Sequence, residues 1–169
     1  MQSRVECLSY KLSMDEVAPI EYVARQIAQI QQRFTQRGGV RPFGISTILS
    51  GFSYDGSPKL YSTDPSGTYS EWKAHAIGRN SSSLKEFLEK HYQDGLEEHD
   101  AIKLAVRTLL EIVESGGKSM EIVVRRNNQA PHMMTADEIQ THVDEVEREK
   151  QAEEEARRAG GSSGAAAGQ

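Results

Sequence analysis

The feature that most constrains the fold is an amphipathic segment near the N-terminus. Over residues 20–34, apolar side chains recur at intervals of three and four positions, and this spacing places them on one face of a helix. Ser13 or Asp15 can cap this helix, and Pro19 is compatible with its first turn. Gly38-Gly39 supplies a left-handed stop. We therefore expect a helix from roughly Val17 to Arg37 that buries one face against a second layer of structure.

The following segment is predicted to form three strands. Residues Phe43 to Phe52 are rich in Ile, Thr, Leu and Phe, and the turn sequence Tyr54 to Pro58 separates them from a return strand at Lys59 to Thr63. A second turn, Asp64 to Gly67, leads into Thr68 to Ile77. Turns this short connect antiparallel neighbours, so the sequence predicts a three-stranded antiparallel meander.

Helical spacing returns in the second half of the chain. Two helices are expected, with apolar faces formed by residues within 84–92 and 102–113, and Gly116-Gly117 ends the second. Met120 to Arg126 reads as a further strand, and Thr135 to Glu138 has the T-x-x-E form of a capping box. The expected order of helix, three strands, two helices, strand and helix belongs to the α+β class of layered domains.

The C-terminal end differs in composition from the rest of the 169-residue chain. Ile139, Val143 and Val146 face inward in the expected last helix. Nothing apolar follows Val146 to anchor the helix, so we expect it to fray from there. A charged run and then a Gly/Ser/Ala-rich end follow, without a sustained apolar seam for a partner helix. We favour a solvated extension over a partner-binding helix, and expect a domain over 1–150 and a disordered tail over 151–169.

Charge and cysteine content limit the possible partners and compartment. The net charge of -5 and the pI near 5.6 argue against nucleic-acid binding, which needs a positive surface. The single cysteine, Cys7, cannot form an internal disulfide, and no apolar run is long enough to span a membrane. The sequence therefore predicts an intracellular protein in a reducing compartment, with no membrane or nucleic-acid partner.

One short segment resembles part of a nucleotide-binding loop. Gly117-Lys118-Ser119 matches the end of that motif, but Ile112 stands where the loop needs its first glycine. The segment also follows an expected helix, whereas the nucleotide loop follows a strand. A helix stop is the better interpretation, and no cofactor is predicted.

Residue types that bind metals or act as nucleophiles are present but not in functional patterns. Ser81, Ser82 and Ser83 lie at an expected helix start, where hydroxyl groups satisfy free backbone amides. The histidines show neither the paired spacing of a zinc site nor a neighbouring cysteine cluster; they are His75, His91, His99, His132 and His142. The sequence therefore predicts no catalytic, cofactor-binding or metal-binding residues.

A series of motifs resembles one protein family over residues 4–150. The segments that carry the resemblance are Tyr22 to Ala28, Gln31 to Gln36, Arg41-Pro42-Phe43-Gly44, Asp64-Pro65-Ser66-Gly67, Ile77-Gly78-Arg79, Glu86 to Lys90 and Leu109-Leu110-Glu111 with Gly116-Gly117-Lys118. They resemble, in this order, alpha-type subunits of the eukaryotic 20S proteasome. The similarity is greatest to the type that occupies the fourth position of the alpha ring.

The resemblance implies a fold and a role. The fold would be a partial N-terminal-nucleophile-hydrolase sandwich of antiparallel sheet and helices. The role would be that of a non-catalytic subunit of the core particle in ubiquitin-dependent protein degradation, in cytoplasm and nucleus. Its partners would be other alpha subunits of a seven-membered ring, the beta subunits and, indirectly, the regulatory particle. Beta subunits cut peptide bonds with an N-terminal threonine, and Met1-Gln2-Ser3 offers no such residue here.

The resemblance also has a gap. The gating segment, an extra helix and the first sheet strands of the family have no counterpart before Arg4, which aligns with the end of a long helix. The gating Tyr-Asp-Arg motif and the lysine that receives activator tails are likewise unmatched. Gating and activator docking are therefore not expected of this chain. An alternative function is that of a shortened product that stays outside the particle as a free interaction module.

Overall fold

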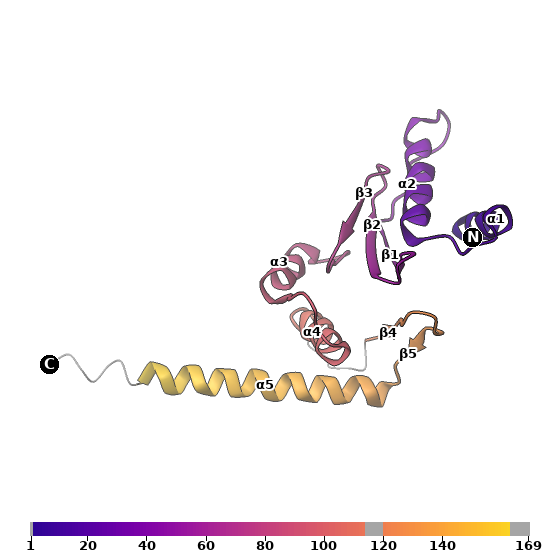
Figure 1. The fold of residues 1–169 in the computed structure, drawn as a ribbon. Coiled ribbons are helices and arrows are strands. Elements are labelled where there is room, and N and C mark those ends of the chain that lie inside the picture. The colour runs from indigo at the N-terminus through magenta and orange to yellow at the C-terminus, as the bar shows by residue number, and fades with distance from the viewer. Residues whose placement is uncertain (1, 114–119, 163–169) are drawn as a thin grey trace. The chain divides into compact units, whose positions relative to one another are not determined.

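The computed structural model describes residues 2–113 and 120–162, with side chains described to residue 156. The chain divides into two compact units (Figure 1). The first comprises residues 1–85 and 125–130, and the second comprises 86–124 and 131–169. Helices and antiparallel sheets occur in the expected alternation, so the prediction of the α+β class is confirmed.

The predicted meander is present in the first unit. Strands β1 (Thr47–Phe52), β2 (Pro58–Thr63) and β3 (Tyr69–Trp72) form an antiparallel sheet in the order β1-β2-β3. Thr63 pairs with Thr47 on one side and with Tyr69 on the other, and the Thr47 and Thr63 hydroxyls lie 2.6 Å apart. β1 and β3 are shorter than the predicted strands at 43–52 and 68–77, while β2 begins one residue before the predicted Lys59.

Helix α2 (Ile20–Gln36) packs against this sheet. Its small residues Ala24 and Ala28 are buried, and they let the helix backbone approach closely. A Cβ placed on Gly51 of β1 would lie 3.0 Å from the Ile20 Cβ. The predicted glycine stop is confirmed, since Gly39 has a φ of 81°.

The expected cap of this helix is wrong. The sequence offered Ser13 or Asp15 as caps, but Pro19 occupies the N-cap without a side-chain hydrogen bond. Ser13 instead donates to the Ser9 carbonyl, inside a separate helix α1 (Gln2–Met14). The resemblance placed the end of a long helix at Arg4, whereas the helix continues to Met14. Periodicity did not predict α1 because its apolar residues are divided between two opposite faces. It contacts α2 through Tyr10 and Tyr22, whose ring centroids are 4.6 Å apart.

The second unit contains helices α4 (Glu98–Leu110) and α5 (Ala136–Ser162). Helix α3 (Ser81–His91) starts in the first unit and continues into the second. The core of the second unit lies between α4 and α5 and consists of Val106, Met120, Ile139, Val143 and Val146. The predicted inward face of the last helix is therefore confirmed.

The strand expected over Met120 to Arg126 is much shorter in the structure. Only β4 (Val123–Val124) is a strand, and it pairs with β5 (His132–Met133), which was not predicted. Met120 is buried in the helical core instead. A two-residue ladder has few backbone hydrogen bonds, so the apolar contacts of the flanking residues hold this segment.

The predicted capping box starts α5. The Glu138 carboxylate accepts a hydrogen bond from the Thr135 backbone amide at 2.7 Å, and the Thr135 hydroxyl accepts one from the Glu138 amide at 3.4 Å. The helix continues to Ser162, beyond Val146, where the sequence predicted fraying. Ion pairs to α4 support this continuation. Of the tail predicted to be disordered over 151–169, residues 151–162 belong to this helix, and 163–169 lie outside the described residues. The expected helix stop at Gly116-Gly117 also lies outside them.

The turn glycine Gly67 gives the first testable prediction. Its φ is +87°, and an added Cβ would lie 2.6 Å from the Gln32 Cβ and 2.8 Å from the Ala28 carbonyl oxygen of α2. Gly67→Ala should therefore combine backbone strain with overpacking. The expected loss in free energy of unfolding is about 1–3 kcal/mol beyond that of a control with strain alone.

Gly39→Ala is the matched control, since Gly39 also has a positive φ but has open space around it. Urea unfolding followed by fluorescence of Trp72, the single tryptophan, reports on this unit. Equal destabilisation by the two substitutions would contradict the close approach of α2 to the turn.

Candidate functional site

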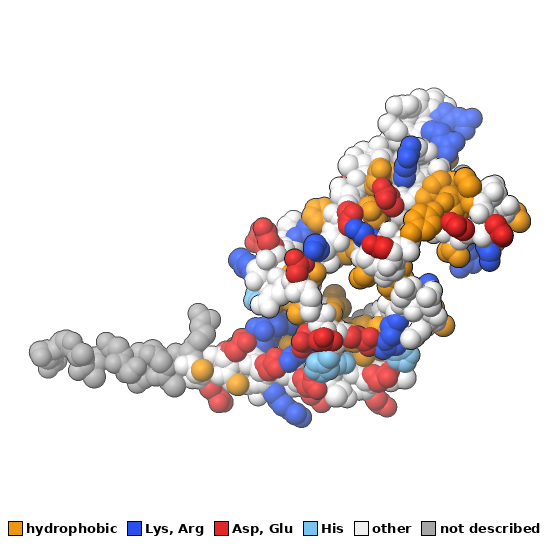
Figure 2. Space-filling view, in the orientation of Figure 1, with side chains coloured by type: hydrophobic (Ala, Val, Ile, Leu, Met, Phe, Trp, Pro, Cys, Tyr) orange, Lys and Arg blue, Asp and Glu red, His pale blue; other side chains and the backbone are white. Residues whose placement is uncertain are grey.

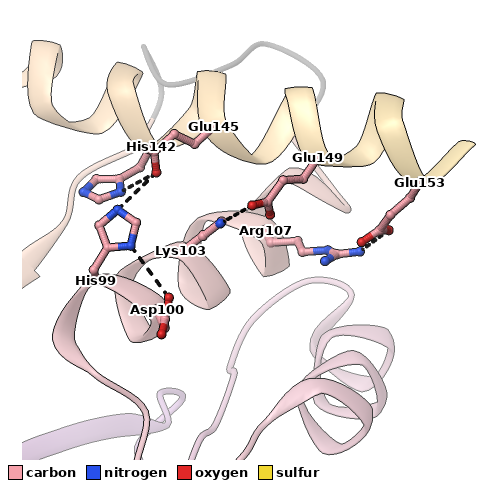
Figure 3. A network of polar contacts seen from close by, with 8 residues as sticks. All are labelled: His99, Asp100, Lys103, Arg107, His142, Glu145, Glu149 and Glu153. Atoms are coloured by element: carbon pink, nitrogen blue, oxygen red, sulfur yellow. Dashed lines mark hydrogen bonds and ion pairs between the residues drawn. The ribbon is translucent and has the colours of Figure 1, made fainter. Parts of the chain in front are cut away.

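A row of ion pairs joins α4 and α5 (Figure 3). Lys103 pairs with Glu149, and Arg107 donates to Glu153 at 2.8 Å. Lys150 donates back to Glu111 at 2.6 Å. Lys103 and Arg107 are four residues apart on α4, as are Glu149 and Glu153 on α5, so these two pairs follow one face. The ion pairs therefore hold the two helices in one alignment along their lengths.

These pairs fix alignment more than they add stability. The carboxylate partners are about half exposed, at 47% for Glu149 and 57% for Glu153. Each such pair contributes about 0–1 kcal/mol. The hydrogen bond to Glu149 raises the pKa of Lys103, which keeps that side chain charged. The buried Val106, Val143 and Val146 supply the larger apolar contribution.

At the start of this row, three metal-ligating side chains converge. His99 comes from α4, while His142 and Glu145 are three residues apart on α5. His99 Nε2 lies 3.1 Å and His142 Nδ1 lies 3.8 Å from the same oxygen, Oε2 of Glu145. The two imidazole rings are tilted, with centroids 5.0 Å apart.

Sequence spacing did not find this cluster because its histidines are 43 positions apart (142 minus 99) and come from two helices. The prediction of no metal site rested on the absence of paired histidines. A usable signal was the His-x-x-Glu spacing of His142 and Glu145 on a helix with an apolar face. Of the other histidines, His91 stacks on Phe87, and His132 lies 3.5 Å from Glu138.

The first unit contains a polar cavity of about 440 Å³ beside the sheet. Trp72 stacks on His75 in its wall, with centroids 4.3 Å apart, and donates to the Ser62 hydroxyl. Burial, reinforced by the charge of Lys85, lowers the pKa of His75, so its imidazole is neutral at pH 7. The Ser46 hydroxyl in the same wall donates to the Asp64 carboxylate at 3.1 Å.

A second polar cluster links β2 and β3. Glu71 accepts hydrogen bonds from Lys59 at 2.5 Å and from the Tyr61 hydroxyl at 3.1 Å. These bonds lower the pKa of the Glu71 carboxyl. Burial, together with the bond to Glu71, raises the pKa of Tyr61 to about 12. Both groups keep one protonation state across the neutral range, so the cluster serves cross-strand pairing.

Two further groups of residues were considered as possible functional sites in the sequence. Ser81, Ser82 and Ser83 open α3, as expected for residues at a helix start. Gly117-Lys118-Ser119 lies outside the described residues. Across the described residues, no helix combines the length and apolar character needed to cross a membrane.

Family comparison identifies the class of protein. The proteasome subunit family matches residues 2–125, which include the whole sheet of the first unit and helices α1 to α4. The chain therefore belongs to the proteasome subunit family. The expected proteasome-type α+β domain is confirmed by this match.

Within the family, the curated relatives that the chain resembles are of the alpha type. It is 56% identical over 151 residues to proteasome subunit alpha type-7 of Dictyostelium discoideum, covering 89% of this chain and 60% of that relative. It is 50% identical over 159 residues to alpha type-7 of Cicer arietinum, covering 94% of this chain and 64% of the relative. Alpha type-8 of Mus musculus is 50% identical over 151 residues, covering 88% of this chain and 60% of the relative. The chain thus spans about 60% of the length of these curated relatives.

A charge reversal tests the ion pairs between α4 and α5. Glu153→Arg should reduce the free energy of unfolding by about 0.5–1 kcal/mol, because it places two cations together. Adding Arg107→Glu should recover most of the loss. In the double variant, the new glutamate lies one helical turn after Lys103 and the new arginine lies one turn after Glu149. Each new side chain is therefore also close to an opposite charge on its own helix.

Urea unfolding followed by far-ultraviolet circular dichroism gives the coupling energy of this double-mutant cycle. If the loss in free energy of unfolding of the double variant equals the sum of the losses of the two single variants, a direct pair between Arg107 and Glu153 is contradicted.

Proposed function

We propose that this chain is a non-catalytic structural alpha subunit of the 20S proteasome core particle and takes part in ring assembly for ubiquitin-dependent protein degradation. The observation that carries the proposal is the family match over residues 2–125, together with 50–56% identity to alpha-type relatives. Membership of the fourth ring position, and residence in cytoplasm and nucleus, belong to the same proposal.

The surface of the first unit supports a role in assembly. Large apolar side chains of α1 are exposed, including Leu8 at 62% and Leu12 at 87%. Figure 2 shows hydrophobic side chains gathered in the region of α1 and α2. Contiguous apolar surface of this kind is typical of contacts with other chains. Neighbouring subunits of a ring would remove it from water.

The sheet of the first unit supports the same role. β1 and β3 are its edge strands, and Ile48 on β1 and Trp72 on β3 are each about two-fifths exposed. Uncovered edges and apolar side chains favour association with other strands. We propose other alpha subunits and beta subunits as the partners, with the regulatory particle contacted only indirectly.

Incorporation into the particle is the decisive test. A tagged copy expressed in the source cells should copurify with core particles that are captured through a different subunit. The Leu8→Ser/Leu12→Ser variant should incorporate at least several-fold less, because it removes apolar surface while changing only exposed side chains.

Met133→Ser is the matched control, since Met133 is 61% exposed but lies in the second unit. Quantitative mass spectrometry of the captured particles gives the ratio. Recovery of the wild-type chain only outside particles would contradict the proposal and favour the alternative of a free, shortened product.

The chain is also expected to lack peptidase activity, because alpha-type subunits leave peptide-bond cleavage to the N-terminal threonine of beta subunits. After incubation with a threonine-directed covalent inhibitor, intact-mass measurement should show this chain unmodified and catalytic subunits of the same particle modified. Stoichiometric labelling of this chain would disprove the expectation.

A further inference from the structure

We propose that His99, His142 and Glu145 form a Zn²⁺ site between α4 and α5. The three side chains present one ligand atom each, and these atoms lie within 4.8 Å of one another. All three residues belong to the second unit. The proposal is independent of the proposed role in the proteasome, since it depends only on this unit.

The spacing of the ligand atoms fits a tetrahedral ion. With zinc–ligand bonds near 2.0–2.1 Å, two ligands of a tetrahedral Zn²⁺ are separated by about 3.3 Å. The two distances to Glu145 Oε2 are 3.1 Å from His99 and 3.8 Å from His142, which lie on either side of this value. All three ligand atoms lie within 4.8 Å of one another, so side-chain rotations that bring the two histidine nitrogens closer would admit the ion.

The polar atoms that face the proposed ion lack hydrogen bonds in the protein. His142 Nδ1 and Glu145 Oε2 are buried without a hydrogen bond, although His99 Nε2 lies in ion-pair contact with Oε2 at 3.1 Å. Buried polar atoms are normally paired, so two adjacent orphans point to a missing partner. A cation bound to His142 Nδ1 and Glu145 Oε2 would give both atoms a partner at the same time. A single proton shared between one histidine and the carboxylate would leave the other histidine without one.

The surroundings select the tautomer and the metal. The Asp100 carboxylate is 3.7 Å from His99 Nδ1, which favours the proton on that nitrogen and leaves the Nε2 lone pair for the ion (Figure 3). Two imidazoles with one carboxylate suit Zn²⁺ rather than Mg²⁺ or Ca²⁺, which prefer oxygen ligands. One carboxylate and two neutral imidazoles would fill three coordination positions of the ion. The fourth position would be open to water, because the His99 side chain is 56% exposed.

Bound Zn²⁺ would link α4 to α5 near the N-terminal half of α5. The ion would occupy the start of the row of ion pairs and so fix the register of the two helices. The role proposed is therefore structural, with a coordination position open to solvent.

Metal binding to the full chain tests the site. After dialysis against Zn²⁺ and desalting, elemental analysis should give one equivalent per chain, and competition with a chromophoric chelator gives the affinity. His99→Ala and His142→Ala should each weaken Zn²⁺ binding at least ten-fold. His132→Ala is the matched control, because His132 also lies near a glutamate in the same unit but outside the cluster.

A spectroscopic measurement on the unmodified chain guards against misfolded variants. Co²⁺ in place of Zn²⁺ should give the intense visible absorption bands of a four-coordinate site, and Zn²⁺ should remove them. Equal Zn²⁺ binding by His99→Ala and His132→Ala, or Co²⁺ bands of a six-coordinate ion, would overturn the proposal. Absence of any binding to the wild-type chain would also overturn it.

Discussion

The close packing of α2 against the three-stranded sheet is the constraint on which the first unit depends. Ala24 and Ala28 give the helix a flat inner face, and Gly51 and Gly67 remove side chains where helix and sheet come nearest. Larger residues at these positions would separate the layers and expose Tyr61 and Thr63, which are buried beneath the helix. The meander is thus stabilised by a helix that precedes it in the sequence.

In the second unit, two helices pack against each other, rather than a helix against a sheet. Its core is a short apolar seam between α4 and α5, bordered by charged pairs and by the histidine cluster. The seam supplies most of the stability, while the polar contacts select one alignment of the helices. Helices packed through aliphatic side chains alone tolerate sliding, and paired charges at fixed spacing restrict it.

Sequence periodicity predicted the elements that bury one continuous face. Helix α2, the meander and the capping box at Thr135 and Glu138 were all found, because each is encoded by local spacing or turn chemistry. Periodicity missed helix α1, because its apolar residues are divided between two faces, and it contacts α2 through Tyr10. The β4–β5 pair was missed because two residues carry no period.

The polar sites were harder to predict for a related reason. His99 and His142 meet only because two helices pack with a particular register, and no local pattern specifies that register. The cavity around His75 likewise depends on how the chain after β3 returns past the sheet. Family resemblance, in contrast, needed no geometry, since it rested on ordered motifs such as Asp64-Pro65-Ser66-Gly67.

The length of α5 divides the helix into two segments with opposite responses to dissolved salt. It has 27 residues and so extends about 40 Å. Its first three turns, ending at Val146, are held by exclusion of water from Ile139 and Val143. The next two turns are held to α4 by Glu149, Lys150 and Glu153. At physiological ionic strength, charges are screened over about 8 Å. Salting-out ions would strengthen the first contact while weakening the second, so ionic strength controls how far along its length the helix stays docked.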